Sequence, residues 1–371
     1  MPQTSKRKVR FAVVGLGHFA QAAILPAFAN TSQAVELAAL VTGDKVKATK
    51  LGRKYKTPAV NYDEYDSLCS SGDIDAVYIA LPNSQHCEYT ERAAHSGIHV
   101  LCEKPLAYSV DDAERMVAAC EAANVRLMTA YRLHFEAGNL QAIKSIQSGE
   151  IGEARLFVSV HTMQVDPDNI RVDSSLGGGP VEDIGIYCLN AARYIFRAEP
   201  EEVTAFSIYG SDARFQEVPE SVSATLRFPD DRLATFLCGF GEAKVSEYRI
   251  IGTKGVLKMD PAFTWQGDIT RTISVGKNER TKTFKHRDQV AAEIDYFAKC
   301  IVGETEPEPS GIEGLIDVKI IDAIRASYRT QKSVRIKGLP SERRPKPSQS
   351  IRKKPPLKSE LVKASPPAKD R

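Results

Sequence analysis

The chain has 371 residues, of which 42% are hydrophobic and 26% are charged. This composition is ordinary for a globular protein of two domains and excludes a fibrous or a largely disordered chain. No apolar run approaches the ~20 residues that span a bilayer, and the basic N-terminus leads into a strand rather than an apolar signal segment, so we expect a cytoplasmic protein with no membrane partner. The seven cysteines form no CxxC pair, which favours a reducing compartment over disulfides or zinc.

The formal net charge of +3 is unevenly distributed along the chain. Residues 341–371 carry ten Lys/Arg and three Asp/Glu, so residues 1–340 have a net charge of −4. The body therefore gives no electrostatic reason to expect a nucleic-acid partner. Residues 338–371 are rich in proline, lysine, arginine and serine, and we expect this basic tail to be disordered because it has little to bury.

Residues 1–130 alternate between short apolar runs and helical patterns. The expected strands are 9–15, 36–42, 74–81, 99–102 and 126–130, and the expected helices between them are 18–30, 48–55, 85–95 and 110–123. Strands that alternate with helices indicate βαβ units. The sequence therefore predicts an α/β domain of the Rossmann type, with a doubly wound parallel sheet.

The pattern changes after about residue 131. Strands are expected at 155–161, 202–209, 221–228, 232–240, 247–252 and 255–259, and helices that cover them at 135–148, 185–196, 289–302 and 311–330. Successive strands with tight connections pair antiparallel. Residues 131–337 are thus predicted to form an α+β substrate-binding domain with an open, mainly antiparallel sheet. An apolar outer face on that sheet would join identical subunits into a homo-oligomer.

The segment GLGHFA at residues 15–20 follows the first strand and precedes a helix, which is the context that the GxGxxA dinucleotide pattern requires. In that pattern Gly15 permits a tight turn, Gly17 lets the backbone approach the pyrophosphate, and Ala20 lets the helix pack close to the strand. The helix N-terminus offers free N–H groups to the phosphates. We therefore expect the turn to contact a dinucleotide through Gly15, Gly17, His18 and Phe19.

The end of the second strand indicates which dinucleotide binds. An NAD enzyme usually places Asp or Glu there, to bond the ribose 2′-OH. Here Thr42 stands at that position, and Lys45 and Lys47 follow it. A hydroxyl and two cations suit a 2′-phosphate dianion, which favours NADP. If Asp44 rather than Thr42 faces the ribose, NAD would be preferred.

Three further segments carry polar residues where ligands bind in such folds. LPNSQH at 81–86 follows the third strand, and Glu-Lys-Pro at 103–105 follows the fourth. The carboxyl ends of parallel strands are the usual ligand-binding edge of a doubly wound sheet. GGGPVEDIGIY at 177–187 opens a helix of the second domain. No HExxH or cysteine/histidine spacing indicates a metal site.

In this order, and with the glycine turn, these segments resemble the Gfo/Idh/MocA oxidoreductases, most closely the glucose–fructose oxidoreductases. The resemblance runs from about residue 8 to 337 and includes YRLH at 131–134. It implies an NADP-dependent oxidoreductase that transfers a hydride between the nicotinamide and a sugar or polyol.

The resemblance also implies roles for individual residues. Lys104 would sit between nicotinamide and substrate, and Asp183 and Tyr187, one helical turn apart, match the family's catalytic pair. Because removal of a hydroxyl proton needs a base, we expect Tyr187 to act as acid and base while the Lys104 ammonium stabilises its phenolate. Asp183 would orient the sugar, and Arg132 and Arg171 would donate to it. The further cofactor contacts expected are Thr42, Lys47, Leu81, Pro82, Asn83, His86, Glu103, Lys104 and Arg132.

Other interpretations remain open on the sequence. Asp183 is also a candidate N-cap for the helix that follows, Tyr187 a candidate half-buried helix residue, and His86 a candidate cap. The family includes enzymes that use bound NAD to cleave glycosides, and a chain of this kind could instead be a non-catalytic NADP-binding scaffold. Only about eight residues precede the first strand, so whether the cofactor is retained or exchanged is open as well.

Overall fold

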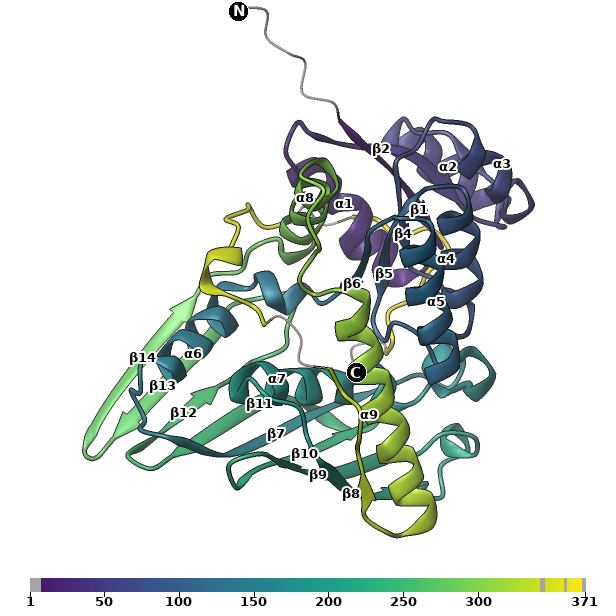
Figure 1. Cartoon of the computed structure of the whole chain (residues 1–371). Coiled ribbons are helices and arrows are strands. Elements are labelled where there is room, and N and C mark those ends of the chain that lie inside the picture. The colour runs from purple at the N-terminus through teal and green to yellow at the C-terminus, as the bar shows by residue number, and fades with distance from the viewer. Residues whose placement is uncertain (1–7, 341–343, 357–358, 369–371) are drawn as a thin grey trace, which may run out of the picture.

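The computed structural model describes residues 8–340, 344–356 and 359–368. Two sheets divide these residues into two lobes, with helices on and between them (Figure 1). The helices are α1 (Leu25–Ala27), α2 (Lys45–Tyr55), α3 (Tyr65–Ser70), α4 (His86–His95), α5 (Val110–Ala122), α6 (Ala137–Gln147), α7 (Ile186–Phe196), α8 (Gln289–Val302) and α9 (Gly311–Thr330).

The sheet of the first lobe has six strands in the order β3-β2-β1-β4-β5-β6 within the described residues, and all neighbouring pairs are parallel. The strands are β1 (Val9–Val14), β2 (Val35–Val41), β3 (Ala59–Val60), β4 (Ala76–Ile79), β5 (His99–Glu103) and β6 (Leu127–Ala130). The predicted Rossmann sheet is thereby confirmed. Its order reverses between β1 and β4, which is the switch point where ligands bind in such sheets.

The helix expected at 18–30 is interrupted. A π-helical turn (Ala20–Ile24), the single turn of α1 and a 3₁₀ turn (Phe28–Asn30) follow one another. Pro26 lies inside this stretch and has no N–H to donate, so a regular α-helix cannot run through it undisturbed. The first turn after Gly17 is kept, because the Gln21 N–H donates to the Gly17 carbonyl.

The second sheet has nine strands in the order β14-β13-β12-β11-β7-β10-β9-β8-β15 within the part of the chain that the structure describes. Only β7 and β10 pair in parallel there, so the predicted open, mainly antiparallel sheet is confirmed. The strands are β7 (Ala154–Gln164), β8 (Glu202–Ile208), β9 (Ser221–Phe228), β10 (Arg232–Gly239), β11 (Gly241–Gly252), β12 (Gly255–Met259), β13 (Ile269–Val275), β14 (Asn278–Phe284) and β15 (Val334–Arg335).

The four helices expected to cover the second sheet do not all do so. α6 and α7 lie over one face of it (Figure 1). α8, however, packs against β1 and β2 through Ile294 and Phe297, which belong to the core of the first lobe. α9 contacts α5 on one side and β8 on the other, so it joins the two lobes. The expectation for α8 was wrong because its apolar residues reveal burial but not the sheet against which they pack.

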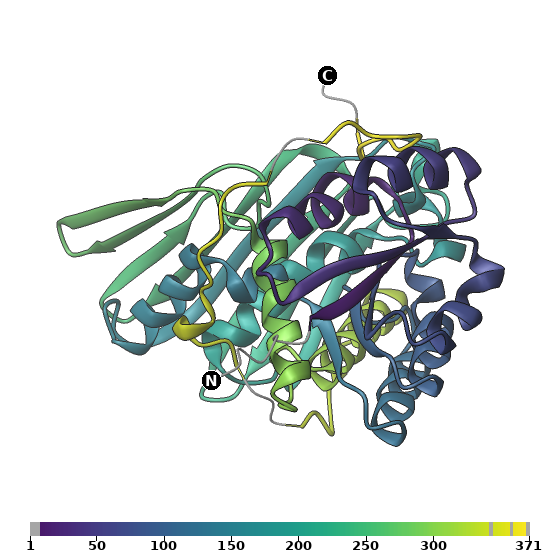
Figure 2. The same cartoon turned by 90° about the horizontal axis from the view of Figure 1, so that it is seen from above.

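The tail expected to be disordered from residue 338 is held against the body wherever the structure describes it, and Figure 2 shows it passing along both lobes. Arg344 is buried and pairs with Glu199 and Glu313, while Lys353 pairs with Asp295. The expectation is corrected for a physical reason. The tail has few apolar groups, but its cations meet carboxylates on a body that carries net negative charge. Residues 341–343, 357–358 and 369–371 lie outside the described residues.

The remaining expectations concern membranes, cysteines and metals. Among the described residues, no helix has the length and apolar character needed to cross a membrane. All seven cysteines fall within the described ranges, and each is buried and unpaired. In the same ranges, no group of three or more His, Cys, Asp or Glu is arranged to hold a metal ion.

Candidate active site

The glycine turn after β1 has the geometry of a dinucleotide cradle. Gly15 adopts φ +91°, and a Cβ there would lie 2.6 Å from the Ala80 carbonyl oxygen, so only glycine fits. Gly17 differs, because a Cβ there would meet nothing within 4 Å. The backbone at Gly17 therefore faces open space that a pyrophosphate can occupy, next to the first N–H groups of a helix. These residues fit the expected cofactor.

The side chains of the same turn reach toward the second lobe. The Phe19 ring meets the Trp265 ring edge-on, with centroids 5.7 Å apart. Burial lowers the pKa of His18, and the positive charge of Arg171, which belongs to the second lobe, lowers it further. The turn thus lies where the two lobes meet, and a dinucleotide seated on it would extend toward the second lobe.

At the end of β2, Thr42 is buried and its hydroxyl oxygen accepts the backbone N–H of Asp44 at 3.3 Å. Asp44 is the N-cap of α2, and its Oδ1 accepts from the N–H groups of Val46 (2.8 Å) and Lys47 (3.0 Å). One carboxylate oxygen of Asp44 is therefore committed to the helix terminus. This arrangement favours Thr42 as the residue below the ribose and leaves the second oxygen of Asp44 as a negative charge beside it.

The loop after β4 joins the glycine-rich segment of the second lobe. The Asn83 amide donates to the Gly177 carbonyl at 2.8 Å. Gly177 has φ +80°, and a Cβ there would lie 2.8 Å from the Asn83 Cβ, so the contact requires glycine. Leu81 and Pro82 precede Asn83, and Leu81 packs beside Gly15.

His86 differs from its expected role as a cofactor contact. Its side chain is completely buried. Its Nε2 lies 3.0 Å from the Leu81 carbonyl, and its Nδ1 lies 3.1 Å and 3.2 Å from those of Pro105 and Leu106. Both ring nitrogens are therefore engaged by the backbone. This corrects the expected cofactor contact, because the His86 ring instead links the loop after β4 to the turn after Lys104 through backbone carbonyls.

The centre of the site is an ionic cluster that spans both lobes. Lys104, just after β5, donates from Nζ to Asp183 Oδ1 at 3.0 Å and to the Asp183 backbone carbonyl at 2.6 Å. Arg171 donates from Nε to Asp183 Oδ2 at 2.6 Å. The peptide bond between Lys104 and Pro105 is cis. Asp183 lies inside the π-helical turn Val181–Gly185 that precedes α7, so it is not the N-cap that its spacing also allowed.

The protonation states of this cluster follow from its charges. Burial would raise the pKa of Asp183, but Arg171 and then Lys104 hold it well below its usual value. Burial would lower the pKa of Lys104, but Asp183 first, and then Tyr187 and Glu103, raise it above its usual value. Near neutral pH the cluster therefore holds a carboxylate, an ammonium and a guanidinium.

Tyr187 lies against this cluster, half-buried in the first turn of α7. The Lys104 Nζ and the Arg132 guanidinium each lie 4.8 Å from the centroid of its ring. The rings of His161 and Phe263 pack on it at 5.7 Å and 6.0 Å between centroids. Two cations and two rings therefore fix the orientation of this phenol.

Arg132 and Glu103 lie beside the cluster, and both form hydrogen bonds with other groups of the protein. The Arg132 guanidinium is buried and donates to Gln289 Oε1 and to the Phe263 carbonyl, each at 2.6 Å. Both terminal nitrogens of Arg132 thus have protein acceptors, and the guanidinium also faces the Tyr187 ring, while its expected contacts with cofactor and substrate stay a prediction. Glu103 accepts the Tyr78 hydroxyl at 2.9 Å, and burial raises its pKa.

His161 is a site residue that the sequence did not predict. It lies on β7, its Nδ1 is 3.2 Å from the Ile184 carbonyl, and burial lowers its pKa to about 3. Phe263, after β12, is a second such residue. Both come from strands of the second lobe that have no motif of their own, so only the fold brings them to Tyr187.

Comparison with known families agrees with this geometry. Residues 9–131 match the family described as "Oxidoreductase family, NAD-binding Rossmann fold", and residues 139–258 match the "GFO/IDH/MocA C-terminal domain". The chain belongs to the Gfo/Idh/MocA oxidoreductase family. The expected membership is confirmed, and this oxidoreductase carries both domains of the family.

Individual relatives of the oxidoreductase cover most of it. A D-xylose 1-dehydrogenase (NADP+) of Haloarcula marismortui is 34% identical over 338 residues, which are 88% of this chain and 93% of the relative. The solved structure of an aldose-aldose oxidoreductase from Caulobacter crescentus, complexed with glycerol, superposes with a TM-score of 0.85 at 37% identity and covers 89% of this chain and 100% of its own. A 3-ketoreductase from Actinomadura kijaniata, in complex with NADP and TDP-benzene, superposes at 0.80 with 28% identity, covering 86% and 98%.

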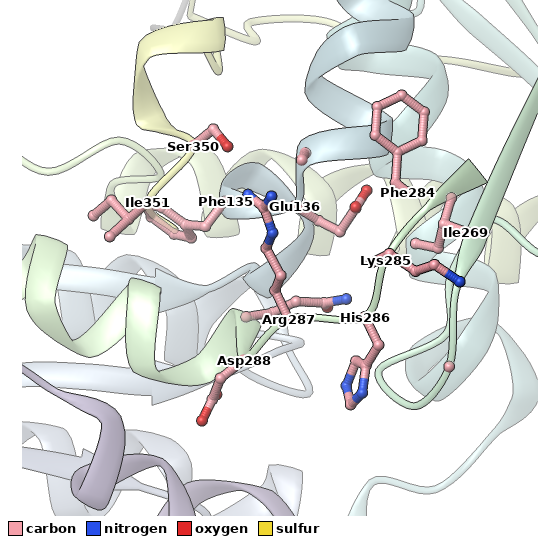
Figure 3. Close-up of a pocket in the computed structure, with 13 residues that line it drawn as sticks. Phe135, Glu136, Ile269, Phe284, Lys285, His286, Arg287, Asp288, Ser350 and Ile351 are labelled. Atoms are coloured by element: carbon pink, nitrogen blue, oxygen red, sulfur yellow. The ribbon is translucent and has the colours of Figure 1, made fainter. Parts of the chain in front are cut away.

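A separate hollow in the oxidoreductase lies away from Lys104 and Tyr187. Figure 3 shows it between Phe135, Phe284 and Arg287, with Ser350 and Ile351 of the tail at its edge. The nearby Glu136 carboxylate already accepts from the N–H groups of Gly138 and Asn139, both at 2.7 Å. The hollow thus marks where the tail passes α6, and the catalytic candidates do not line it.

Proposed function

We propose that this protein is an NADP-dependent oxidoreductase that transfers a hydride between the nicotinamide and a carbon of a sugar, with Tyr187 as the acid and base. The observation that carries the proposal is the contact of the Lys104 ammonium with both Asp183 and the Tyr187 ring. It joins the end of β5, beside the dinucleotide turn, to the second lobe. The relatives described above, a D-xylose 1-dehydrogenase, an aldose-aldose oxidoreductase and a 3-ketoreductase, support this substrate class.

NADP is proposed as the cofactor, with NAD as the less favoured alternative. The buried Thr42 at the end of β2, with Lys47 one turn into α2, suits the 2′-phosphate. Gly15 and Gly17 hold the pyrophosphate segment of the site. The relatives named for NADP or solved with it support the choice. When bound, the nicotinamide accepts or supplies the hydride.

The chemistry of the protein side chains concerns the proton. Oxidation of a carbinol releases its hydroxyl proton as the C–H hydride leaves, and a carbonyl remains. Tyr187 takes that proton, and the nearby Lys104 cation favours the phenolate that must receive it. Asp183 keeps Lys104 and Arg171 in place and accepts from a sugar hydroxyl with its remaining lone pairs. In the reverse direction Tyr187 returns the proton to the carbonyl oxygen.

The proposed function is tested by mixing the purified protein with free NADP+ and a panel of aldoses, and following the absorbance of the reduced nicotinamide. Accumulation with one sugar alone is the result expected of a simple aldose dehydrogenase. Turnover that requires a second sugar as hydride acceptor would indicate a two-sugar oxidoreductase. Release of a chromogenic aglycone without net reduction would favour the glycosidase alternative, and binding of NADP without any reaction would favour a scaffold.

The outer face of the second sheet supports a homo-oligomer. Large apolar side chains of β7, β8, β10 and β11 are exposed, including Phe206 (66%), Ile208 (59%) and Leu237 (48%). An exposed apolar face of this kind is typical of a subunit interface. We propose that two copies pack through it. F206E/L237E is expected to shift the protein from dimer or tetramer to monomer in sedimentation velocity, whereas E279K, on the exposed strand β14, should leave the assembly unchanged.

A further inference from the structure

The C-terminal segment 359–368 crosses the region where the cofactor is expected. At its start, the Lys54 ammonium at the end of α2 donates to the Ser359 hydroxyl at 2.7 Å. Near its end, the Asp166 N–H of the second lobe donates to the Pro367 carbonyl at 2.8 Å. The segment therefore runs from the C-terminal end of α2 in the first lobe to the loop after β7 (Figure 2).

The middle of this segment is seated beside the glycine turn by Gln21. The Gln21 side chain is completely buried, its Oε1 accepts the Val362 N–H at 2.7 Å, and its Nε2 donates to the Val362 carbonyl at 3.0 Å. The same Nε2 donates to the carbonyl of Leu16, inside the glycine turn, at 2.9 Å. One buried amide thus ties the tail directly to the backbone that would hold the pyrophosphate. Such a satisfied polar contact specifies the position of the tail.

Lys363, the next residue, brings a cation to the end of β2. It has φ +45°, a left-handed conformation that is uncommon outside glycine, and its Nζ lies 3.2 Å from Asp44 Oδ2. Asp44 Oδ1 is occupied by the start of α2, so Oδ2, the oxygen that Lys363 meets, is the one that remains for this pairing. The backbone N–H of Lys47 and the Lys363 ammonium both keep the pKa of Asp44 below its usual value, so the group is a carboxylate.

A carboxylate at this corner is the feature that repels a 2′-phosphate and selects NAD. We propose that the C-terminal segment 359–368 forms part of the cofactor site and that Lys363, by pairing with Asp44 next to Thr42, selects NADP over NAD. This inference rests on the proposed NADP function. Lys363 offsets the charge of Asp44 and adds a third cation to Lys45 and Lys47 near the phosphate. The specificity of a site in the first lobe is thereby set from the opposite end of the chain.

The test measures the dissociation constants of NADP+ and NAD+ for the full-length protein by isothermal titration calorimetry. K363N removes the charge and keeps a residue that tolerates the left-handed backbone. K363R keeps the charge. K354A is the matched control, since it removes another exposed lysine from the tail. D44N keeps an oxygen to cap α2 and removes the negative charge.

K363N is expected to weaken NADP+ binding by about tenfold while NAD+ binding changes less than about twofold. K363R and K354A should bind as the unaltered protein does. D44N/K363N should regain most of the lost NADP+ affinity, because the charge that Lys363 offsets is absent. An unchanged ratio of the two constants in K363N, or an equal loss in K354A, would overturn the inference. If the unaltered protein binds neither dinucleotide, the proposed function itself is wrong.

Discussion

Two clusters of charged side chains lie inside the molecule, and they differ in how completely they are enclosed. In the first, the side chains of Lys104, Asp183 and Arg171 are 9%, 19% and 25% exposed. In the second, Arg193 of α7 pairs with Asp317 of α9 at 2.6 Å, and both side chains are fully buried. The two clusters lie on the same helix unit, since Asp183 precedes α7 and Arg193 is near its end.

The difference in exposure distinguishes a candidate ligand site, the open cluster, from a purely structural contact, the closed cluster. The closed cluster also engages Glu313 and, from the tail, Arg344, so its charges are satisfied by the protein alone. It can fix α7 against α9, and its central pair, Arg193 and Asp317, is closed to solvent. The open cluster is partly accessible to solvent, and the half-buried Tyr187 lies against it. Its charges can therefore exchange a contact with a substrate hydroxyl, which is what hydride transfer from a sugar requires.

The largest expected effect is on the open cluster. K104A should lower kcat/KM with an aldose by about 10³-fold, because it removes the cation beside the Tyr187 ring on which the proposed proton transfer depends. The dissociation constant of NADP+ should change far less, and both are measured on the same preparation by initial rates and calorimetry. K319A removes a half-exposed lysine of α9 and serves as the control. Activity of K104A within tenfold of the unaltered protein would contradict the assignment.

An Arg→Met substitution can be made in each cluster, and the effects on stability can then be compared. R193M should lower the free energy of unfolding in urea by about 3–5 kcal/mol, because buried Asp317 and Glu313 lose their countercharge. R171M should cost about 1 kcal/mol or less, since water reaches the partly exposed Asp183. Its effect should instead appear as a higher KM for the sugar. Equal losses of stability in the two variants would remove the distinction between the clusters.

A smaller effect is expected from His161, as a dependence of stability on pH. The folded protein keeps its imidazole neutral down to a pKa of about 3, whereas in the unfolded chain it takes up a proton below about 6.5. The free energy of unfolding therefore decreases as pH falls below 6.5, by about 1 kcal/mol per pH unit. Urea unfolding at pH 7 and pH 5 should show a smaller loss for H161Q than for the unaltered protein. An equal loss would show that His161 is not held neutral.

The sequence predicted the fold where the pattern of apolar residues is local. The strands and helices of the first lobe alternate regularly, and the parallel order follows from that alternation. The hairpin β13–β14 was missed because β14, NERTKTF, lies exposed along most of its length and shows no apolar alternation. The tail was expected to be disordered because composition indicates only how much apolar surface a segment can bury. It does not show that Arg344 would meet Glu199 and the buried Glu313.

The site was predictable where a motif marks the end of a strand. Lys104, Asp183 and Tyr187 meet as expected, and Asn83 bonds to Gly177 of the glycine-rich segment in the second lobe. His86 was expected to contact the cofactor, but the structure commits both of its ring nitrogens to backbone carbonyls, while the expected ligand contacts of Arg132 stay a prediction. His161 and Lys363 were missed because their positions depend on the packing of distant segments, which sequence spacing does not encode. The complete site therefore required the tertiary structure.

Proton transfer at Tyr187 is the role proposed for the open cluster, and Y187F tests it most directly. The measurement is single-turnover reduction of NADP+ by a saturating aldose, followed by the absorbance of the reduced nicotinamide, with the urea unfolding midpoint determined on the same sample. The rate should fall by about 100-fold or more at an unchanged midpoint, because only the phenolic hydroxyl is removed. An unchanged rate would contradict this role and assign the base to another group.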